Sequence, residues 1–141
     1  MKLLGILLFV IGIVVGLQFV LEPILHTATP EAPFSSNWKY VNIATMVAIV
    51  IGLIVSSLPP KKSDGSSANC SACTRNNIYC TGYFVLLLLF IWNYAQLFNE
   101  SYTELAATKE VHSLIWVIID VSVVLLSISL GKDLWRSKPS D

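Results

Sequence analysis

Charged residues are scarce in this chain of 141 residues, and their scarcity argues against a soluble fold. Asp, Glu, Lys and Arg make up 13% of the sequence, whereas a soluble domain carries about 25%. The nine basic and nine acidic residues cancel, so the net charge does not indicate nucleic acid or an acidic substrate as a partner. Because 55% of the residues are hydrophobic, the composition indicates an integral membrane protein whose surroundings are the lipid bilayer.

Histidine is also scarce, and the motifs of common catalytic sites are missing. The chain has two histidines and contains no Ser/His/Asp order, phosphate-binding Gly-rich loop, HExxH or paired-carboxylate motif. A lone buried acid lacks the partner that acid/base catalysis normally needs. We therefore expect no enzymatic activity, no catalytic residue and no cofactor.

What the chain does have is four long apolar runs, each 17 to 19 residues long: Leu3–Leu21, Val41–Leu58, Gly82–Phe98 and Ser113–Gly131. A helix that rises about 1.5 Å per residue needs about 17 to 25 residues to cross a bilayer's hydrocarbon core. Runs of this length without polar alternation are typical of helices and not of barrel strands. The sequence predicts an all-α, four-transmembrane-helix bundle that forms a single membrane domain over residues 1–141.

Most basic residues lie near what would be one side of the membrane. Seven of the nine fall at the amino terminus, between the second and third runs, or in the carboxyl tail: Lys2, Lys61, Lys62, Arg75, Lys132, Arg136 and Lys138. Because the cytoplasmic side retains Lys and Arg, both termini are expected in the cytoplasm, in a multi-pass protein of the cell (inner) membrane. The Ser/Gly-rich segment 59–81 is then expected to be a flexible cytoplasmic loop.

Aromatic residues near the ends of the runs are interpreted as interfacial anchors, because Trp and Tyr favour the headgroup region. They are Trp38, Tyr40, Tyr102 and Trp116 on the outer side and Tyr79, Tyr83 and Trp135 on the inner side.

Three cysteines, Cys70, Cys73 and Cys80, lie in the predicted cytoplasmic loop. A structural zinc site needs four ligands, and both histidines, His26 and His112, are expected on the other side of the membrane. A redox role would need a thioredoxin-like fold, for which the loop is too short. We interpret the cysteines as reduced thiols and assign no metal site, although a metal site completed by a partner or a redox switch stays an alternative.

Small residues recur at helical spacing in the first two runs. Ala44, Ala48, Gly52 and Ser56 follow one another every four residues, and Gly12 and Gly16 repeat the interval in the first run. Such small-xxx-small motifs form a groove that lets another helix approach closely, which matters because lipid supplies no hydrophobic force for helix association. We expect the first and second helices to pack closely through these residues, with Leu53 facing lipid.

One carboxylate, Asp120, stands in the middle of the fourth run. Intramembrane polar residues elsewhere are expected in the outer halves of the helices or on the face of Asp120: Gln18, Asn42, Asn93, Gln96, Ser113 and Ser127. A charge at this depth is costly and by default signals function. The structural alternatives are a protonated acid that fastens the bundle by hydrogen bonds to Asn93, Gln96 or a serine, and an acid that pairs with a basic residue on a different subunit.

Two functions fit these patterns. The first is a small integral membrane protein that acts as an accessory or assembly subunit of a larger membrane complex, with other membrane subunits or copies of itself as partners. The second is a homo-oligomeric transporter of a small solute, ion or proton that uses Asp120. A subunit should co-purify with a larger partner, whereas a transporter should form a defined oligomer alone.

Overall fold

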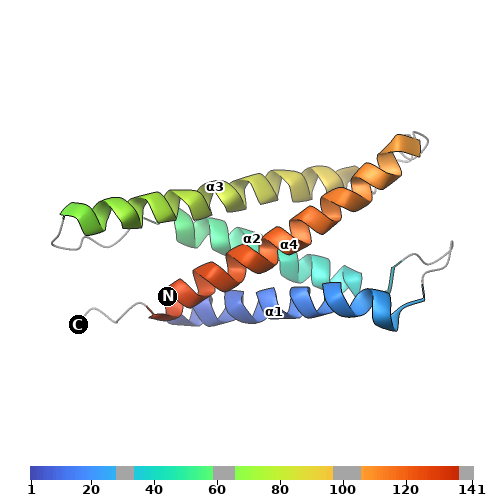
Figure 1. Ribbon diagram of the computed structural model, residues 1–141, viewed down its shortest axis with the longest axis horizontal. Helices are drawn as coiled ribbons and strands as arrows, with labels where there is room; N and C mark the ends of the chain where they lie inside the picture. Colours follow the sequence, from blue (N-terminus) through green and yellow to red (C-terminus); the bar gives the residue numbers. More distant parts are fainter. Residues whose placement is uncertain (28–33, 59–65, 97–105, 137–141) are drawn as a thin grey trace.

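The computed structural model describes residues 1–27, 34–58, 66–96 and 106–136, and it describes no side chains within 66–72 and 106–110. These ranges contain no strand and four α-helices: α1 (Lys2–Leu25), α2 (Trp38–Ser57), α3 (Ser66–Gln96) and α4 (Ala106–Arg136) (Figure 1). Each helix contains a stretch long and apolar enough to cross a membrane. The all-α prediction with four membrane-length helices is confirmed, and it indicates a multi-pass membrane protein.

The helices alternate in direction and pack as a ring. The start of α1, the end of α2, the start of α3 and the end of α4 lie at one end of the bundle, which we call the N/C end (Figure 1). The opposite ends of the helices form the far end. Helix α1 lies along α4 and α2 lies along α3, with further contacts between α1 and α2 and between α3 and α4.

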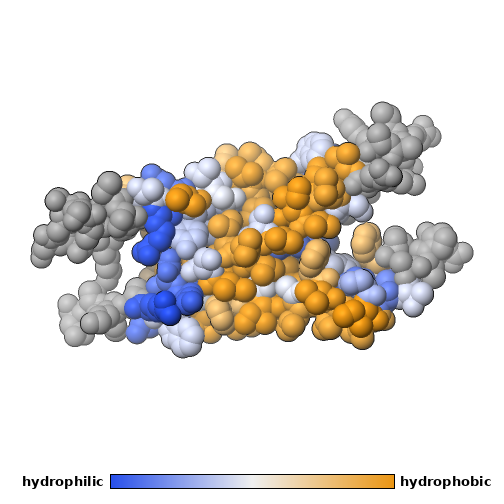
Figure 2. All heavy atoms as spheres, in the orientation of Figure 1, coloured by the Kyte–Doolittle hydropathy of each residue, from blue (hydrophilic) through white to orange (hydrophobic). Residues whose placement is uncertain are grey.

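The surface of the bundle is divided by depth. Figure 2 shows an apolar band around the middle of the molecule, with hydrophilic residues gathered most strongly at the N/C end. Large aliphatic side chains on every helix face outward, among them Leu17, Ile54, Leu88 and Leu125. Such an outward-facing apolar band matches the hydrocarbon core of a bilayer.

Helix α3 begins at Ser66, so residues 66–81 are helical and not the flexible loop that we expected from their polarity. Contacts with α2 help to explain the difference. The side-chain amide of Asn76 donates to the backbone oxygens of Ser56, at 2.5 Å, and Leu58, at 3.2 Å. It thereby satisfies carbonyl groups that the end of α2 leaves without helical partners. Polar residues thus extend the helix beyond its apolar run.

A second polar contact joins α3 to α4 at the N/C end. Arg75 forms an ion pair with Asp133 at 3.5 Å, and the hydroxyl of Tyr79 donates to the same carboxylate at 3.0 Å. Because Arg75 and Asp133 are partly exposed, the ion pair alone contributes little stability. Its role is to fix the register of the two helices where they leave the apolar band.

The glycines of α1 face α4, not α2, which corrects the helix pairing expected from the sequence. A methyl group added at Gly5 would lie 2.7 Å from the Cβ of Leu134, and one added at Gly12 would lie 3.0 Å from Ile128. A methyl group at Gly131 of α4 would lie 2.6 Å from the backbone oxygen of Gly5. Glycines on both helices therefore bring the two backbones together.

The small residues of α2 pack against an aromatic side chain of α3 and not against a helix backbone. Ala48, Gly52 and Ser56 are buried and Ala44 is half-buried. The aromatic ring of Tyr83 lies directly against Gly52, in space that any side chain there would need. Ala48 belongs to the same core, and the Ser56 hydroxyl donates to the backbone oxygen of Leu53.

Tyr83 is therefore a core residue and not the interfacial anchor that we expected. Its side chain is fully buried, and its hydroxyl donates to Ser127 on α4 at 3.3 Å. Buried tyrosines usually find such a partner for the hydroxyl group. The residue thus joins α2, α3 and α4 in one layer.

At the far end, Glu22 joins the end of α1 to the residues that precede α2. Its carboxylate accepts hydrogen bonds from the Gln18 amide at 2.6 Å and from both the backbone N–H and the hydroxyl of Ser35 at 2.7 Å. Charge-assisted bonds of this kind are among the stronger ones in proteins. They position Trp38, the first residue of α2, at the mouth of the cavity described next.

Candidate functional site: a cavity at Asp120

A cavity of about 450 Å³ opens in the far half of the bundle, and Asp120 forms part of its wall. Residues of α1, α2 and α4 and of the segment before α2 line it: Phe19, Phe34, Trp38, Asn42, Ser113, Leu114, Trp116, Val117 and Asp120. Its volume lies within the range of about 300 to 1,000 Å³ that is usual for small-molecule sites. Asp120 is the only titratable side chain in this lining, all of which belongs to the described part of the chain.

Asp120 lies deep in the membrane-length part of α4. That stretch runs from Val111 to Arg136, and Asp120 is nine residues, or about 14 Å, from its far end. The residue is 3% exposed, although it faces the cavity. The carboxyl group is thus removed from bulk water, at the wall of a cavity in the far half of the bundle.

The carboxyl group has an oxygen that nothing in the described chain satisfies. Oδ1 of Asp120 is buried and has no hydrogen-bond partner among the described residues, and the same is true of Oδ1 of Asn42 in the same cavity. Among the described residues, none of the expected fastening bonds from Asn93, Gln96 or a serine reaches Asp120. Two buried oxygens without a partner beside one cavity are free to accept hydrogen bonds from a bound ligand.

Three of the other polar residues expected to converge on Asp120 have hydrogen-bond partners elsewhere. Asn93 is buried and donates to the backbone oxygen of His112 at 3.4 Å. Ser127 accepts from Tyr83, and Gln18 donates to Glu22. Gln96 is half-buried as the last residue of α3. Of the candidates only Ser113 and Asn42 share the cavity with Asp120.

Aromatic side chains form most of the cavity's remaining wall, and the sequence did not identify them as site residues. Trp116 is held in place, because its indole N–H donates to Nε2 of His112 at 3.1 Å. The Trp116 ring also packs edge-to-face with Phe90, at a centroid distance of 5.5 Å. In the sequence, Trp38 and Trp116 fit the pattern of interfacial anchors. Only their place beside Asp120 in the folded chain distinguishes them from ordinary anchors.

The cavity ends in a packed core on the N/C side of Asp120. Ile119 and Val123 flank the acid along α4 and are fully buried. Closer to the N/C end, the Tyr83 ring fills the space against Gly52, and its hydroxyl donates a hydrogen bond to Ser127. In this conformation the cavity is thus separated from the N/C end by a layer of packed side chains.

Neither Cys73 nor Cys80 lines this cavity. Cys73 is exposed near the N/C end, and Cys80 is half-buried with its sulfur 3.5 Å from the Ser57 hydroxyl. The side chain of Cys70 lies outside the described residues. No group of three or more His, Cys, Asp and Glu side chains within the described ranges is close enough to hold a metal ion.

Removing the acid should cost the bundle little stability. Because no described residue bonds to Oδ1 of Asp120, Asp120→Leu is expected to change the free energy of unfolding in detergent by less than about 1 kcal/mol, or to increase it. Thermal unfolding of the purified protein measures this change, with Ser127→Ala as the control that removes an observed hydrogen bond without adding volume. A clear loss of stability in Asp120→Leu would identify the acid as a structural residue.

The arrangement offers one carboxyl group, one amide oxygen and one hydroxyl group within an aromatic cavity. Such a set can bind and orient a small ligand, and it lacks a second titratable group for acid/base chemistry. In a comparison with known proteins no family model matches the chain, and no curated protein or solved structure matches it.

Proposed function

We propose that the protein is a small-solute or ion transporter of the membrane that binds its cargo at Asp120 from the far end of the bundle. The observation that carries the proposal is the buried carboxyl oxygen without a partner at the wall of a cavity. An intramembrane acid that served only assembly would be expected to hydrogen-bond within the bundle or to face another subunit. Among the described residues no hydrogen bond reaches Oδ1 of Asp120, and the residue lines the chain's own cavity, which favours ligand binding.

The packed layer below the acid supports the same proposal. A transporter must close one side of its site while the other side is open, so that cargo does not leak. The Tyr83 ring and its bond to Ser127 close the N/C side of the site. The role proposed for Asp120 is binding and not catalysis.

Access to Asp120 can be tested with a water-soluble thiol reagent. In a background with Cys70→Ser, Cys73→Ser and Cys80→Ser, Asp120→Cys is expected to react through the cavity. Val123→Cys is the matched control, because Val123 lies one turn further along α4 and is fully buried. The rate of labelling should differ by at least about tenfold. Equal rates at the two positions would mean that no open path leads to Asp120.

We propose that the N/C end faces the cytoplasm of a cell whose plasma (inner) membrane holds the protein. Lys2, Arg75, Lys132 and Arg136 lie at this end among the described residues, whereas Lys39 lies at the far end. This asymmetry supports the orientation through the positive-inside tendency.

The orientation predicts how the native cysteines react in intact cells. An impermeant thiol reagent should leave the exposed Cys73 unlabelled until the membrane is permeabilised, because the side chain lies near the N/C end. Cys73→Ala is the control that identifies the labelled residue. Labelling of Cys73 before permeabilisation would invert the proposed topology.

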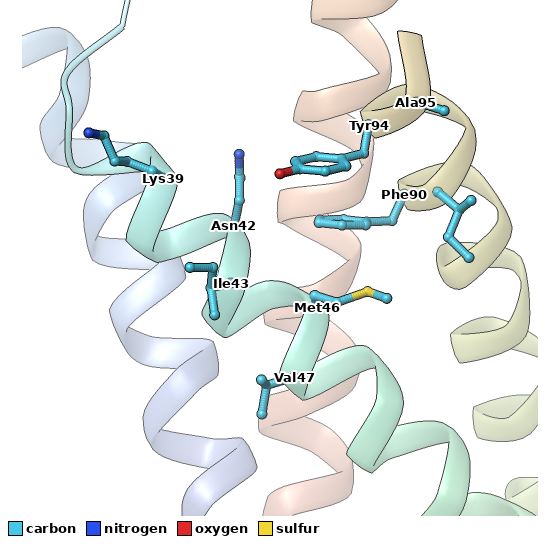
Figure 3. A pocket seen from close by; sticks show the side chains of 9 residues that line it. Lys39, Asn42, Ile43, Met46, Val47, Phe90, Tyr94 and Ala95 are labelled. Carbon is cyan, nitrogen blue, oxygen red and sulfur yellow. The ribbon is translucent and has the colours of Figure 1, made fainter. Parts of the chain in front are cut away.

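An accessory or assembly subunit is the second candidate, and a separate groove supports it. Between the far halves of α2 and α3 lies an open groove of about 840 Å³ with mostly apolar walls. Figure 3 shows Met46 and Val47 of α2 on one side and the rings of Phe90 and Tyr94 of α3 on the other. The two rings stack at a centroid distance of 5.7 Å. An apolar groove of this kind could receive a helix of another subunit.

The two candidates differ in what co-purifies with the chain. A photocrosslinker at Val47 in the groove should capture a larger partner if the protein is a subunit. The same group at Val121 is a matched control, because Val121 is as exposed as Val47 but lies on α4, outside the groove. Purification in mild detergent as a defined homo-oligomer, without a partner at Val47, would support the transporter.

A further inference from the structure

The cavity at Asp120 has an acid but no base. Its lining contains no Lys, Arg or His among the described residues, and Lys39 lines the neighbouring groove instead. A carboxylate in a low-dielectric environment is disfavoured unless a positive charge accompanies it. Since the described lining supplies no such charge, the ionised form of Asp120 would favour a cationic ligand.

A bare metal ion fits this wall poorly. Asp120, Asn42 and Ser113 together offer four side-chain oxygens, whereas hard cations such as Ca²⁺ take about six to eight. The remaining lining is aromatic or aliphatic and supplies no further side-chain ligand for a hard cation. A cation that carries apolar surface of its own fits this lining better.

The aromatic wall fits a cation of this kind. Phe19, Phe34, Trp38 and Trp116 all contribute to the lining, and the face of a Trp or Phe ring attracts an organic cation within about 6 Å of its centroid. Trp116 is already oriented by its bond to His112, so it would lose little freedom on binding. A volume of about 450 Å³ leaves room for a molecule with one ring and a short chain.

We propose that the cavity binds a small organic ammonium ion with a flat apolar group, whose charge lies at Asp120 and whose apolar part packs against Trp116. The proposal rests on the proposed function, because it names the class of cargo for the same site. The Asn42 amide oxygen, which also has no partner among the described residues, accepts a second hydrogen bond from the ammonium group.

Three probes separate the charge from the ring. Binding of 2-phenylethylammonium, 2-phenylethanol and ethylammonium to the full-length protein in detergent is measured by calorimetry. The first probe has both ring and charge, the second has only the ring and the third only the charge. We expect 2-phenylethylammonium to bind at least about tenfold more tightly than either of the others, which corresponds to about 1.4 kcal/mol.

Two variants assign the contributions to residues. Asp120→Asn should remove the preference for 2-phenylethylammonium over 2-phenylethanol. Trp116→Leu should weaken 2-phenylethylammonium at least about fivefold while leaving ethylammonium unchanged. Trp92→Leu is the matched control, because Trp92 is exposed on α3 and lines neither cavity. Phe19→Leu replaces Trp116→Leu if the latter protein unfolds.

The outcomes separate the ligand class from the site itself. If the alcohol binds as tightly as the ammonium ion, or if Asp120→Asn leaves the preference intact, the proposed ligand class is wrong. Should Asp120→Cys nevertheless react with the thiol reagent, the site would be open and its cargo would belong to another class. If Asp120→Cys fails to react as well, the transporter proposal fails with the ligand.

Discussion

Gly52→Leu is expected to lower the free energy of unfolding by about 3 kcal/mol or more, the upper end of what overpacking usually costs. The ring of Tyr83 already occupies the space that the new side chain needs. Because Tyr83 is fully buried and its hydroxyl is bonded to Ser127, the ring cannot rotate away without losing that bond. The measurement is thermal or denaturant unfolding in one detergent, with the oligomeric state checked at each step.

Two controls test the reason for this effect. Ile54→Ala trims a side chain that is 59% exposed and should change stability little. Leu53 is less suitable, because it is half-buried and packs against the core, contrary to our expectation that it faces lipid. Tyr83→Ala combined with Gly52→Leu should recover part of the loss, since the smaller residue frees the space. A double variant with fully additive losses would contradict the proposed clash.

The four spans could be predicted from the sequence because hydropathy reports directly on burial in lipid. The helix ends could not, since they depend on contacts between elements. The composition of residues 66–81 is typical of a loop. Their helix depends on contacts that the sequence does not show: Asn76 donates to a backbone carbonyl at the end of α2, and the Tyr79 hydroxyl donates to Asp133 on α4. Polarity excluded this segment from the apolar core, but it did not exclude a helix beyond that core.

Helix pairing was the part that the sequence predicted wrongly. A run of small residues indicates that another group packs closely against the helix. It does not indicate whether that group is a helix backbone or a side chain. In α1 the partner is the backbone of α4, and at Gly52 it is the ring of Tyr83. Tyr83 could not be identified as a core residue from the sequence, because a tyrosine near a helix end fits an interfacial anchor equally well. Only the packed neighbours decide between the two roles.

Of the candidate site, the acid could be predicted from the sequence and the cavity around it could not. Asp120 is conspicuous because a carboxylate is costly in hydrocarbon. The cavity around it depends on where α1, α2 and α4 bring Phe19, Trp38 and Trp116. Residues on three helices meet there, and no spacing within one helix encodes such a meeting. Of the polar residues expected with Asp120, Gln18, Asn93 and Ser127 have hydrogen-bond partners elsewhere, whereas Asn42 and Ser113 line the cavity.

Gly131→Ala is expected to destabilise the protein and Gly16→Ala is not, although the substitution is the same. At Gly131 the new methyl group would lie 2.6 Å from the backbone oxygen of Gly5 and 2.9 Å from the backbone nitrogen of Phe9. Backbone atoms cannot rotate aside as a side chain does, so α1 and α4 must separate. We expect a loss of about 1 to 3 kcal/mol in the free energy of unfolding.

At Gly16 the nearest atoms to an added methyl group are the Val124 side-chain methyls, at 3.5 Å, which is ordinary contact distance. Alanine there gains helix propensity of up to about 1 kcal/mol over glycine, so Gly16→Ala should be neutral or stabilising. Unfolding of both variants in the same detergent gives the comparison. If Gly131→Ala were tolerated as well as Gly16→Ala, the close approach of α1 and α4 at the N/C end would be wrong. The closure of the N/C end would then lose its support, because the contact between α1 and α4 on that side of Asp120 is part of what confines the cavity to the far half of the bundle.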